Sequence, residues 1–247
     1  MPEIEEKKLA DRGFRQWVTA NTAAHKVPGY TIVNASFKPT GGIPGDATSE
    51  QMRAVARLAE KYSFGEVRVT HAQNLTMPHV RTKDLVEVWE QLKEHDLAEA
   101  NIGLIGDIIS CPGLDYCALA TARSIPVAQE ISSRFADLKK QHDVGPLKLN
   151  ISGCINACGH HHVGHIGILG VDKKGKEFYQ ITLGGSSAEN ASIGKILGPG
   201  FGAEDIADAI ETVVDTYLNV RGQGEEFLHT YRRLGSAPFK EALYASN

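Results

Sequence analysis

The segment CPGLDYC, at residues 111–117, places two cysteines six positions apart, and CINAC, at residues 154–158, holds the only other two cysteines of the 247-residue chain. Each pair follows a short apolar run, GLIGDIIS before Cys111 and LKLNI at residues 147–151. Short apolar runs that end at Gly or Pro are typical of buried strands. We therefore expect both cysteine pairs to lie where regular elements end.

The composition of the chain narrows the possible classes of protein. With 42% hydrophobic residues and a formal net charge of −4, it is typical of a globular protein of one or two domains. The N-terminal MPEIEEKKLADR lacks the apolar run of a signal peptide, and no window approaches ~18 consecutive apolar residues, so we expect no membrane span and a cytoplasmic location. In that reducing compartment, paired cysteines favour metal binding or catalysis over disulfides. The slightly acidic balance argues against nucleic acid as a partner.

The first hundred residues predict strands that alternate with helices. The segment YTIVNASFK, at residues 30–38, is rich in β-branched and aromatic residues and predicts a strand. The capping-box spacing from Thr48 to Gln51 predicts the start of a helix. The buried stripe of this helix is predicted to consist of Met52, Val55, Ala56 and Ala59.

A second strand and helix follow. Residues 66–77 predict one strand, or two with a break at residues 72–74. Thr82 is a candidate cap for the next helix. Its buried stripe is predicted to consist of Leu85, Val88, Trp89 and Leu92. This order predicts a small α/β layer with helices covering one face of a sheet.

The second half of the chain predicts longer elements around the cysteines. Residues 116–138 predict a helix that carries Cys117 in its first turn. The segments HIGILGV and FYQITLGG predict a pair of strands joined by the turn DKKGK. Residues 203–220 predict an amphipathic helix. One face of that helix carries Ile206, Ile210, Val213 and Tyr217.

Four cysteines in two pairs are compatible with a [4Fe–4S] cluster. Such a cluster needs four thiolates at one small site, and here C-x₅-C and C-x₃-C are separated by thirty-six residues. Gly113, Gly153 and Gly159 lie beside the cysteines, and glycine lets backbone approach a bulky inorganic core.

Other interpretations of the cysteines stay open at this point. Structural zinc sites favour short gaps, so C-x₃-C fits zinc and C-x₅-C fits it less well. The nearby histidines that could add nitrogen ligands are His160, His161, His162 and His165. Three of them, at positions 160–162, are also candidates for proton donors near a cofactor, although hydrogen bonds that brace the loop are the favoured role. A third possibility is four buried thiols that serve only as apolar side chains.

C-x₅-C followed by SGCINACGHHHVGHIG resembles the signature of the siroheme- and [4Fe–4S]-dependent sulfite and nitrite reductase hemoproteins. The likeness covers about residues 25–245 and corresponds to the C-terminal half of family members, which usually contain two copies of a ferredoxin-like segment and catalytic layer. It implies an α+β fold. The expected parts are an N-terminal extension at 1–25, a ferredoxin-like α/β segment, the reductase half-domain, at 26–100, and a mixed α/β domain that binds cluster and siroheme at 101–247.

The resemblance also implies roles for individual residues. The four cluster thiolates correspond to Cys111, Cys117, Cys154 and Cys158. The sulfur of Cys158 corresponds to the one that also ligates the siroheme iron. Ser152 and Asn156 correspond to positions near the siroheme, where polar groups meet its ring carboxylates.

The activity that this resemblance implies is the six-electron reduction of sulfite to sulfide or of nitrite to ammonia, with a small oxyanion as substrate. The implied electron donor is a ferredoxin or a flavoprotein. An alternative is a single-copy electron-transfer protein that carries these cofactors without full reductase activity. The sequence resembles only the second copy, whereas the family's cationic substrate-binding residues lie in the first. We therefore expect the active unit to need a first-copy half-chain or a second identical chain.

Overall fold

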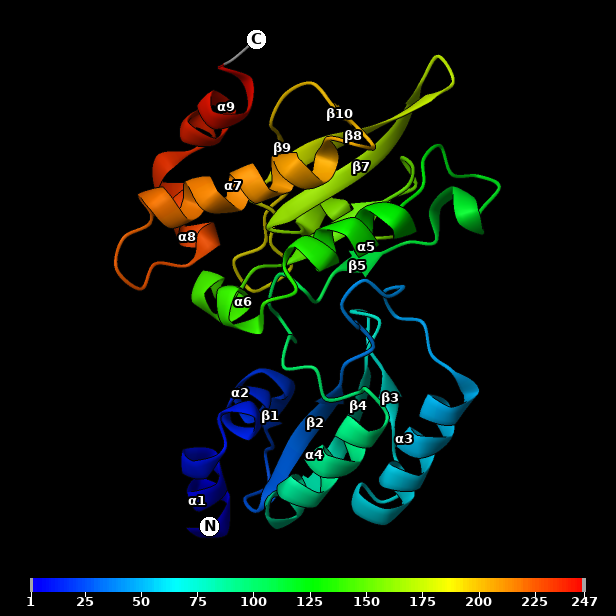
Figure 1. The fold of residues 1–247 in the computed structure, drawn as a ribbon, viewed down its shortest axis with the longest axis vertical. Coiled ribbons are helices and arrows are strands. Elements are labelled where there is room, and N and C mark those ends of the chain that lie inside the picture. Colours follow the sequence, from blue (N-terminus) through cyan, green and yellow to red (C-terminus); the bar gives the residue numbers. More distant parts are fainter. Residues whose placement is uncertain (1, 246–247) are drawn as a thin grey trace. The chain divides into compact units, whose positions relative to one another are not determined.

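A computed structural model describes residues 2–245 of the chain (Figure 1). The chain divides between Ile102 and Gly103 into two compact units, each with its own sheet and helices. This mixture of helices and sheets confirms the predicted fold class. No helix in the described part of the chain is both long and apolar enough to span a bilayer.

The first unit is built on a four-stranded antiparallel sheet with the order β1-β2-β4-β3. Its strands are β1 (Thr22–Ala24), β2 (Tyr30–Ala35), β3 (Arg68–Val69) and β4 (Leu75–Arg81). Its helices are α1 (Pro2–Ala10), α2 (Arg12–Asn21), α3 (Ser49–Tyr62) and α4 (Leu85–Glu94), with a short 3₁₀ turn η1 (Thr82–Asp84) before α4. The break predicted between two strands at 72–74 is confirmed.

The N-terminal helices contribute to the core of this unit. Phe14 and Trp17 of α2 are completely buried, as are Val33 of β2 and Met77 of β4. The Phe14 ring lies 5.2 Å, centroid to centroid, from the ring of Trp89 in α4. The residues predicted to form an extension therefore share one hydrophobic core with the ferredoxin-like segment.

The helix predictions in this unit are partly right. The capping box is confirmed, because Thr48 accepts from the Gln51 N–H and the Gln51 side chain accepts from the Thr48 N–H. The stripe predicted for α3 is wrong at Met52 and Ala56, which are exposed. The buried residues of α3 are Ala54, Val55, Leu58, Ala59 and Tyr62. Leu58 and Tyr62 each carry more apolar surface than Ala56 or Ala59 of the predicted stripe. The buried face of α3 is therefore centred nearer to Leu58 and Tyr62 than the prediction placed it.

Thr82 does not cap α4, which corrects another prediction. It begins the turn η1, and its hydroxyl lies 2.9 Å from the Thr31 hydroxyl on β2. The buried stripe predicted for α4 is confirmed at all four positions.

The second unit is built on a mixed sheet with the order β10-β8-β7-β6-β5, and β9 pairs with β8. Its strands are β5 (Ile109–Ser110), β6 (Leu149–Ser152), β7 (Ile166–Lys173), β8 (Lys176–Leu183), β9 (Lys195–Ile196) and β10 (Phe201–Gly202). Its helices are α5 (Ile125–Arg134), α6 (Leu138–Val144), α7 (Ile206–Val220), α8 (Phe227–Leu234) and α9 (Ala237–Tyr244), with 3₁₀ turns η2 (Gly113–Asp115) and η3 (His161–Val163). The predicted β7–β8 pair and its turn are confirmed.

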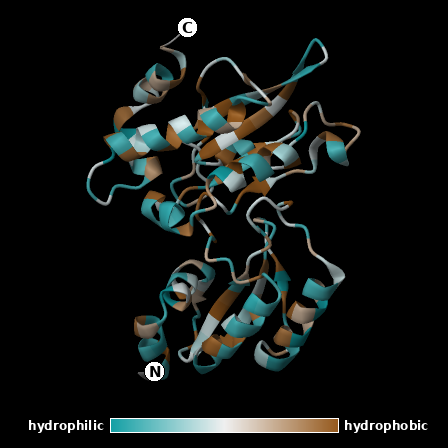
Figure 2. Ribbon diagram, viewed as in Figure 1, coloured by the Kyte–Doolittle hydropathy of each residue, from teal (hydrophilic) through white to brown (hydrophobic). Residues whose placement is uncertain are grey.

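The core of the second unit lies between this sheet and the helices α5 and α7 (Figure 2). The apolar face predicted for the last long helix is confirmed, because Ile206, Ile210, Val213 and Tyr217 of α7 are buried. Ile151 and Ile168, which pair across β6 and β7, are completely buried.

The helix predicted at 116–138 is wrong. The structure has an irregular turn from Cys117 to Ser124, then α5, then a separate α6. Pro126 lies in the first turn of α5, where a missing N–H is tolerated, and it could not lie inside a longer helix. Cys117 is therefore held by a turn.

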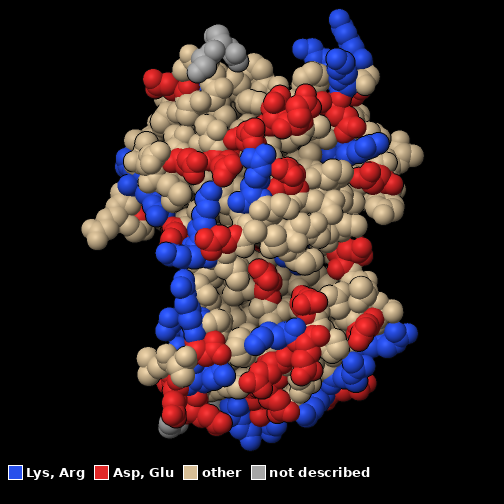
Figure 3. All heavy atoms as spheres, viewed as in Figure 1, with Lys and Arg blue, Asp and Glu red and all other residues tan. Residues whose placement is uncertain are grey.

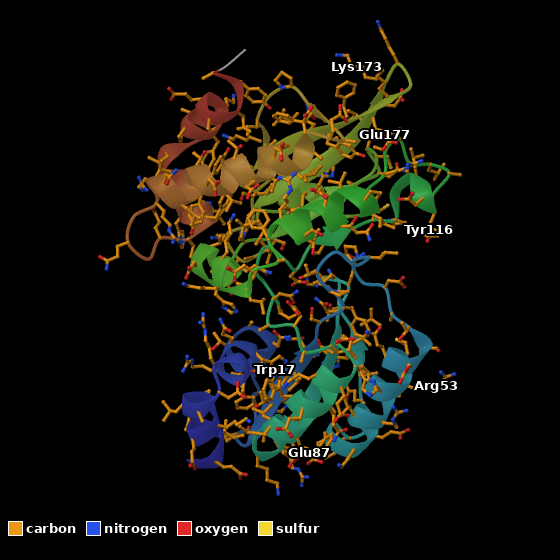
Figure 4. All side chains as sticks on the ribbon, in the orientation of Figure 1. Trp17, Arg53, Glu87, Tyr116, Lys173 and Glu177 are labelled. Atoms are coloured by element: carbon orange, nitrogen blue, oxygen red, sulfur yellow. The ribbon has the colours of Figure 1, made fainter. Side chains whose placement is uncertain are left out.

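Surface charges of both signs are interspersed on the face that Figure 3 shows. Several pair between elements, as Arg134 of α5 does with Asp208 and Glu211 of α7. Exposed pairs of this kind each add little stability. The tip of the β7–β8 hairpin departs from this mixing of charge signs, because its charges are mainly basic (Lys173 is labelled in Figure 4).

Candidate functional site

The two cysteine-bearing loops lie side by side in the second unit. Strands β5 and β6 are parallel, and Ser110 pairs with Ile151, so both strands end at the same edge of the sheet. Cys111 follows β5 directly, and its N–H donates to the Ile151 carbonyl at 3.1 Å. The Gly153 N–H donates to Cys111 Sγ at 3.1 Å, which brings the first cysteine against the residue that precedes Cys154. The expectation that both pairs lie where regular elements end is confirmed.

The sulfur of Cys111 lies in a dry, hydrogen-bonding environment. Cys111 is buried, and Ser124 Oγ lies 3.4 Å from its Sγ. Donors aimed at a sulfur stabilise a thiolate and so favour metal ligation over a role as a simple apolar side chain.

Cys117 is fixed by the turn that begins at Gly113. The Cys117 N–H donates to the Gly113 carbonyl at 2.9 Å, and the Cys117 carbonyl accepts from the Ala120 N–H at 3.1 Å. The cysteine is partly exposed.

The segment from Thr121 to Ser124 ties the two loops together. The Thr121 N–H, the Ala122 N–H and the Thr121 hydroxyl all donate to the Gly153 carbonyl, at 2.9–3.0 Å. The Ala122 carbonyl in turn accepts from the Leu114 N–H at 3.1 Å. One short segment therefore bonds to the Cys111–Cys117 loop and to the residue before Cys154. No pattern in the sequence marked this segment.

The second loop carries one buried and one exposed cysteine. Cys154 is buried and Cys158 is exposed. The Ala157 N–H donates to the Cys154 carbonyl at 3.1 Å, and both Ala157 and His160 have a left-handed backbone (φ 57° and 54°). This tight reversal presents Cys158 at the surface of the loop.

Glycines let the main chain of these loops approach other backbone closely. A Cβ on Gly159 would lie 1.8 Å from the Ile151 carbonyl oxygen. A Cβ on Gly153 would lie 2.6 Å from the Ala122 carbonyl oxygen, and one on Gly113 would lie 2.5 Å from the Ser124 nitrogen. Each of these positions accepts only glycine without a backbone shift.

Three buried polar atoms beside the second loop have no hydrogen-bond partner among the described residues. They are Asn150 Oδ1, Ser152 Oγ and His161 Nδ1. Buried polar groups are seldom left unpaired, so these atoms are suited to hold a polar group from outside the chain. Ser152 is one of the two residues predicted to lie near a siroheme, and the other, Asn156, is exposed.

The cysteine loops also expose apolar side chains. Those with large exposed fractions are Leu114, Tyr116, Leu119 and Ile155. Tyr116, labelled in Figure 4, lies within the Cys111–Cys117 loop. Large apolar side chains exposed on both cysteine loops favour a surface that another group or chain covers.

The described residues contain no group of three or more His, Cys, Asp or Glu side chains placed to hold one metal ion. A [4Fe–4S] cluster does not need such convergence on one ion, since its four irons each take their own thiolate. The Gly153 N–H directed at Cys111 Sγ, the Ser124 hydroxyl beside that sulfur and the unpaired polar atoms fit a cluster with an adjacent polar cofactor.

The histidines of the second loop differ in their surroundings. His161 is buried, and its ring lies tilted against that of the exposed His162, with ring centroids 3.9 Å apart. Burial, and to a lesser degree His162, lowers the pKa of His161 to about 4. Burial likewise lowers the pKa of His165 to about 4, helped by the nearby charges of Lys148 and Arg232.

We expect His165 to make the second unit sensitive to acid. Unfolded His165 binds a proton below its ordinary pKa of 6.5, whereas folded His165 binds one only near pH 4. The contribution of neutral His165 to the free energy of unfolding is therefore complete above pH 6.5. It decreases between pH 6.5 and pH 4, by up to about 3 kcal/mol. Its Nδ1 accepts the Lys148 N–H at 3.3 Å, a bond that only the neutral ring makes.

The measurement is urea unfolding of wild type and of His165→Gln at pH 7 and pH 4.5. Glutamine retains an acceptor for the Lys148 N–H and does not titrate. We expect the variant to lose less free energy of unfolding between the two pH values than wild type. An equal loss in both proteins would contradict the assignment.

Two family models match the chain. Residues 40–95 match the nitrite/sulfite reductase ferredoxin-like half domain, and residues 104–246 match the nitrite and sulphite reductase 4Fe-4S domain. A sulfite reductase [ferredoxin] 2 of Mycolicibacterium paratuberculosis is 30% identical over 75% of this chain and 35% of its own length. A ferredoxin–nitrite reductase of Synechococcus elongatus is 30% identical over 69% of this chain and 34% of its own length. The chain thus spans about a third of these curated relatives.

Solved structures show the same fold. The NirA protein of Mycobacterium tuberculosis superposes with a TM-score of 0.71 at 24% identity, over 89% of this chain and 41% of its own. Dissimilatory sulfite reductase I superposes with a TM-score of 0.70 at 12% identity, over 87% of this chain and 69% of its own.

Proposed function

The chain belongs to the nitrite and sulfite reductase family, and we propose that it holds the coupled [4Fe–4S] cluster and siroheme at which sulfite is reduced to sulfide, or nitrite to ammonia. The observation that carries this proposal is the approach of the two cysteine loops, with the Gly153 N–H directed at Cys111 Sγ. The domain boundaries predicted at residues 26–100 and 101–247 form part of the same proposal.

The four thiolates of the proposed cluster are Cys111, Cys117, Cys154 and Cys158. Cys158 is the exposed cysteine of the four, and we assign its thiolate to both the cluster and the siroheme iron. A thiolate shared by two cofactors must be accessible to the siroheme as well as to the cluster. Ser152, with its unpaired hydroxyl, and the exposed Asn156 are assigned to the siroheme side. When bound, the two cofactors would supply the electrons for reduction of a small oxyanion.

The residues of the chain hold and shield this site. The Gly153 N–H donates to Cys111 Sγ, and burial at the end of the sheet keeps water from Cys111 and Cys154. His161 has its pKa lowered and is neutral near pH 7, so it adds no charge there.

We assign the remaining parts of the active unit to partners. The chain spans about a third of its curated relatives, and the cysteine loops expose Leu114, Tyr116, Leu119 and Ile155. Both facts support a complementary half that covers the loops and supplies cationic groups for the oxyanion, either a first-copy half-chain or a second copy of this chain. The names of two relatives include ferredoxin, which supports a ferredoxin as electron donor.

A visible spectrum of the chain, produced with siroheme supply and purified without oxygen, tests the proposal. A strong Soret-like band with iron and sulfide in the protein supports it. A broad shoulder alone would indicate an electron-transfer module that holds a cluster without siroheme, and a colourless protein would refute the assignment of either cofactor. Stoichiometric siroheme with sulfite turnover by the isolated chain as a monomer would contradict the need for a complementary half.

A further inference from the structure

Ser124 occupies the N-cap position of α5 but does not cap the helix. A serine at this position normally accepts from an N–H of the first helical turn, whereas the Ser124 side chain makes no such bond. The side chain is completely buried, and its hydroxyl lies 3.4 Å from Cys111 Sγ. A thiolate only accepts hydrogen bonds, so the hydroxyl donates to the sulfur when Cys111 binds iron.

The glycines of both loops make room for this contact. A Cβ on Gly113 would lie 2.9 Å from Ser124 Oγ, and a Cβ on Gly153 would lie 2.8 Å from it. The Gly153 N–H donates to the same sulfur at 3.1 Å. Cys111 Sγ therefore receives one backbone donor and one side-chain donor, and only the second is open to substitution without moving the main chain.

The position of Ser124 is set by the peptide groups of its neighbour. The Arg123 N–H donates to Glu177 Oε2 at 2.7 Å, and the Tyr179 hydroxyl donates to the Arg123 carbonyl at 2.8 Å. The same hydroxyl lies 2.9 Å from Glu177 Oε2. Tyr179 is buried, and burial together with Glu177 raises the pKa of its phenol, so it stays protonated. Two side chains of β8 thus hold both ends of the Arg123 residue (Glu177 is labelled in Figure 4).

We propose that the Ser124 hydroxyl raises the reduction potential of the cluster through its hydrogen bond to Cys111, and that Tyr179 and Glu177 are positioning residues that hold Ser124 in place. The inference rests on the cluster assignment of the preceding subsection. Each electron that enters the cluster adds negative charge, which spreads onto the thiolates. A donor to a thiolate stabilises the reduced form more than the oxidised form, because hydrogen bonds strengthen with the charge of the acceptor.

A redox titration of the cluster in the cluster-loaded chain tests the role of Ser124. For Ser124→Ala we expect a roughly tenfold lower equilibrium constant for reduction, a potential about 59 mV more negative for a one-electron couple. The control is Ser133→Ala on the same helix, because that hydroxyl is exposed and donates to the Gln129 carbonyl at 2.9 Å. It should leave the potential unchanged. An unchanged potential in Ser124→Ala would overturn the proposal.

A double-mutant cycle tests the positioning role. Tyr179→Phe should lower the potential in the same direction by a smaller amount, and it should shift the potential no further in the Ser124→Ala background. Equal shifts in both backgrounds would show that Tyr179 does not act through Ser124. If Ser124→Ala lost its cluster, Tyr179→Phe alone would carry the test, because it leaves Ser124 unchanged.

The iron and sulfide content of the wild-type protein distinguishes a failure of the cluster assignment from a failure of the role proposed for Ser124. A wild-type chain without a cluster refutes the proposed function itself. A loaded wild type whose potential responds to none of these substitutions refutes only the present inference.

Discussion

Alanine in place of Gly159 is expected to destabilise the second unit by roughly 3 kcal/mol and to abolish cluster binding. The added Cβ would lie 1.8 Å from the Ile151 carbonyl oxygen, which belongs to β6 and already accepts the Cys111 N–H. The overlap is with the backbone of β6, which is paired on both sides, so it cannot be relieved by a change of rotamer. Relief requires moving the loop that carries Cys158, the strand that precedes Cys154, or both.

Calorimetry of the apo chain and iron content of the loaded chain measure this effect. Gly222→Ala is the matched control, because the nearest atom to its added Cβ, Glu225 Oε2, lies 3.5 Å away. Trp17 and Trp89 are the only tryptophans of the chain and lie in the first unit. Their fluorescence should report an unchanged transition of that unit. A Gly159→Ala protein that binds iron as wild type does would refute the argument.

The same contacts explain what the glycines of the site do. From the sequence, Gly113, Gly153 and Gly159 were interpreted as places where backbone approaches an inorganic core. In the structure, a Cβ at each of them would meet protein backbone first, at Ser124, Ala122 and Ile151. The glycines therefore allow the loops to pack on each other and on β6, which is a condition for bringing the thiols together.

Local patterns predicted the parts of the fold that depend on neighbouring residues. The β7–β8 pair follows from alternation around a Gly-containing turn, and the buried face of α7 follows from its helical spacing. The helix predicted at 116–138 does not form as one helix, because proline is tolerated only in the first turn of a helix and Pro126 lies in the middle of that range. The apolar pattern alone does not show that a new helix, α5, begins at this proline. The sequence alone placed Cys111 and the Cys154–Cys158 pair after strand ends, whereas it placed Cys117 in the first turn of a helix where the structure has an irregular turn.

The supporting residues of the site could not be predicted in this way. Ser124 lies thirteen positions from Cys111, and Tyr179 lies fifty-six positions from Arg123, so both contacts depend on the register of the sheet. Serine, tyrosine and glutamate are common in loops and strands, and nothing in their spacing separates these three from the rest. Only the tertiary structure shows that their polar atoms converge on the two peptide groups of Arg123 and on the Cys111 sulfur.

The role of residues 1–25 was likewise invisible to local patterns, and it leads to a further expected result. Trp17→Ala should destabilise the first unit by about 3–5 kcal/mol, because Trp17 is completely buried and its removal leaves a cavity between α2 and the sheet. Trp89, the remaining tryptophan, reports the unfolding of this unit by fluorescence. Leu9→Ala is the control, since the Leu9 side chain is 82% exposed and should change the free energy of unfolding by less than about 0.5 kcal/mol. A Trp17→Ala protein as stable as Leu9→Ala would show that the N-terminal helices are dispensable to this core.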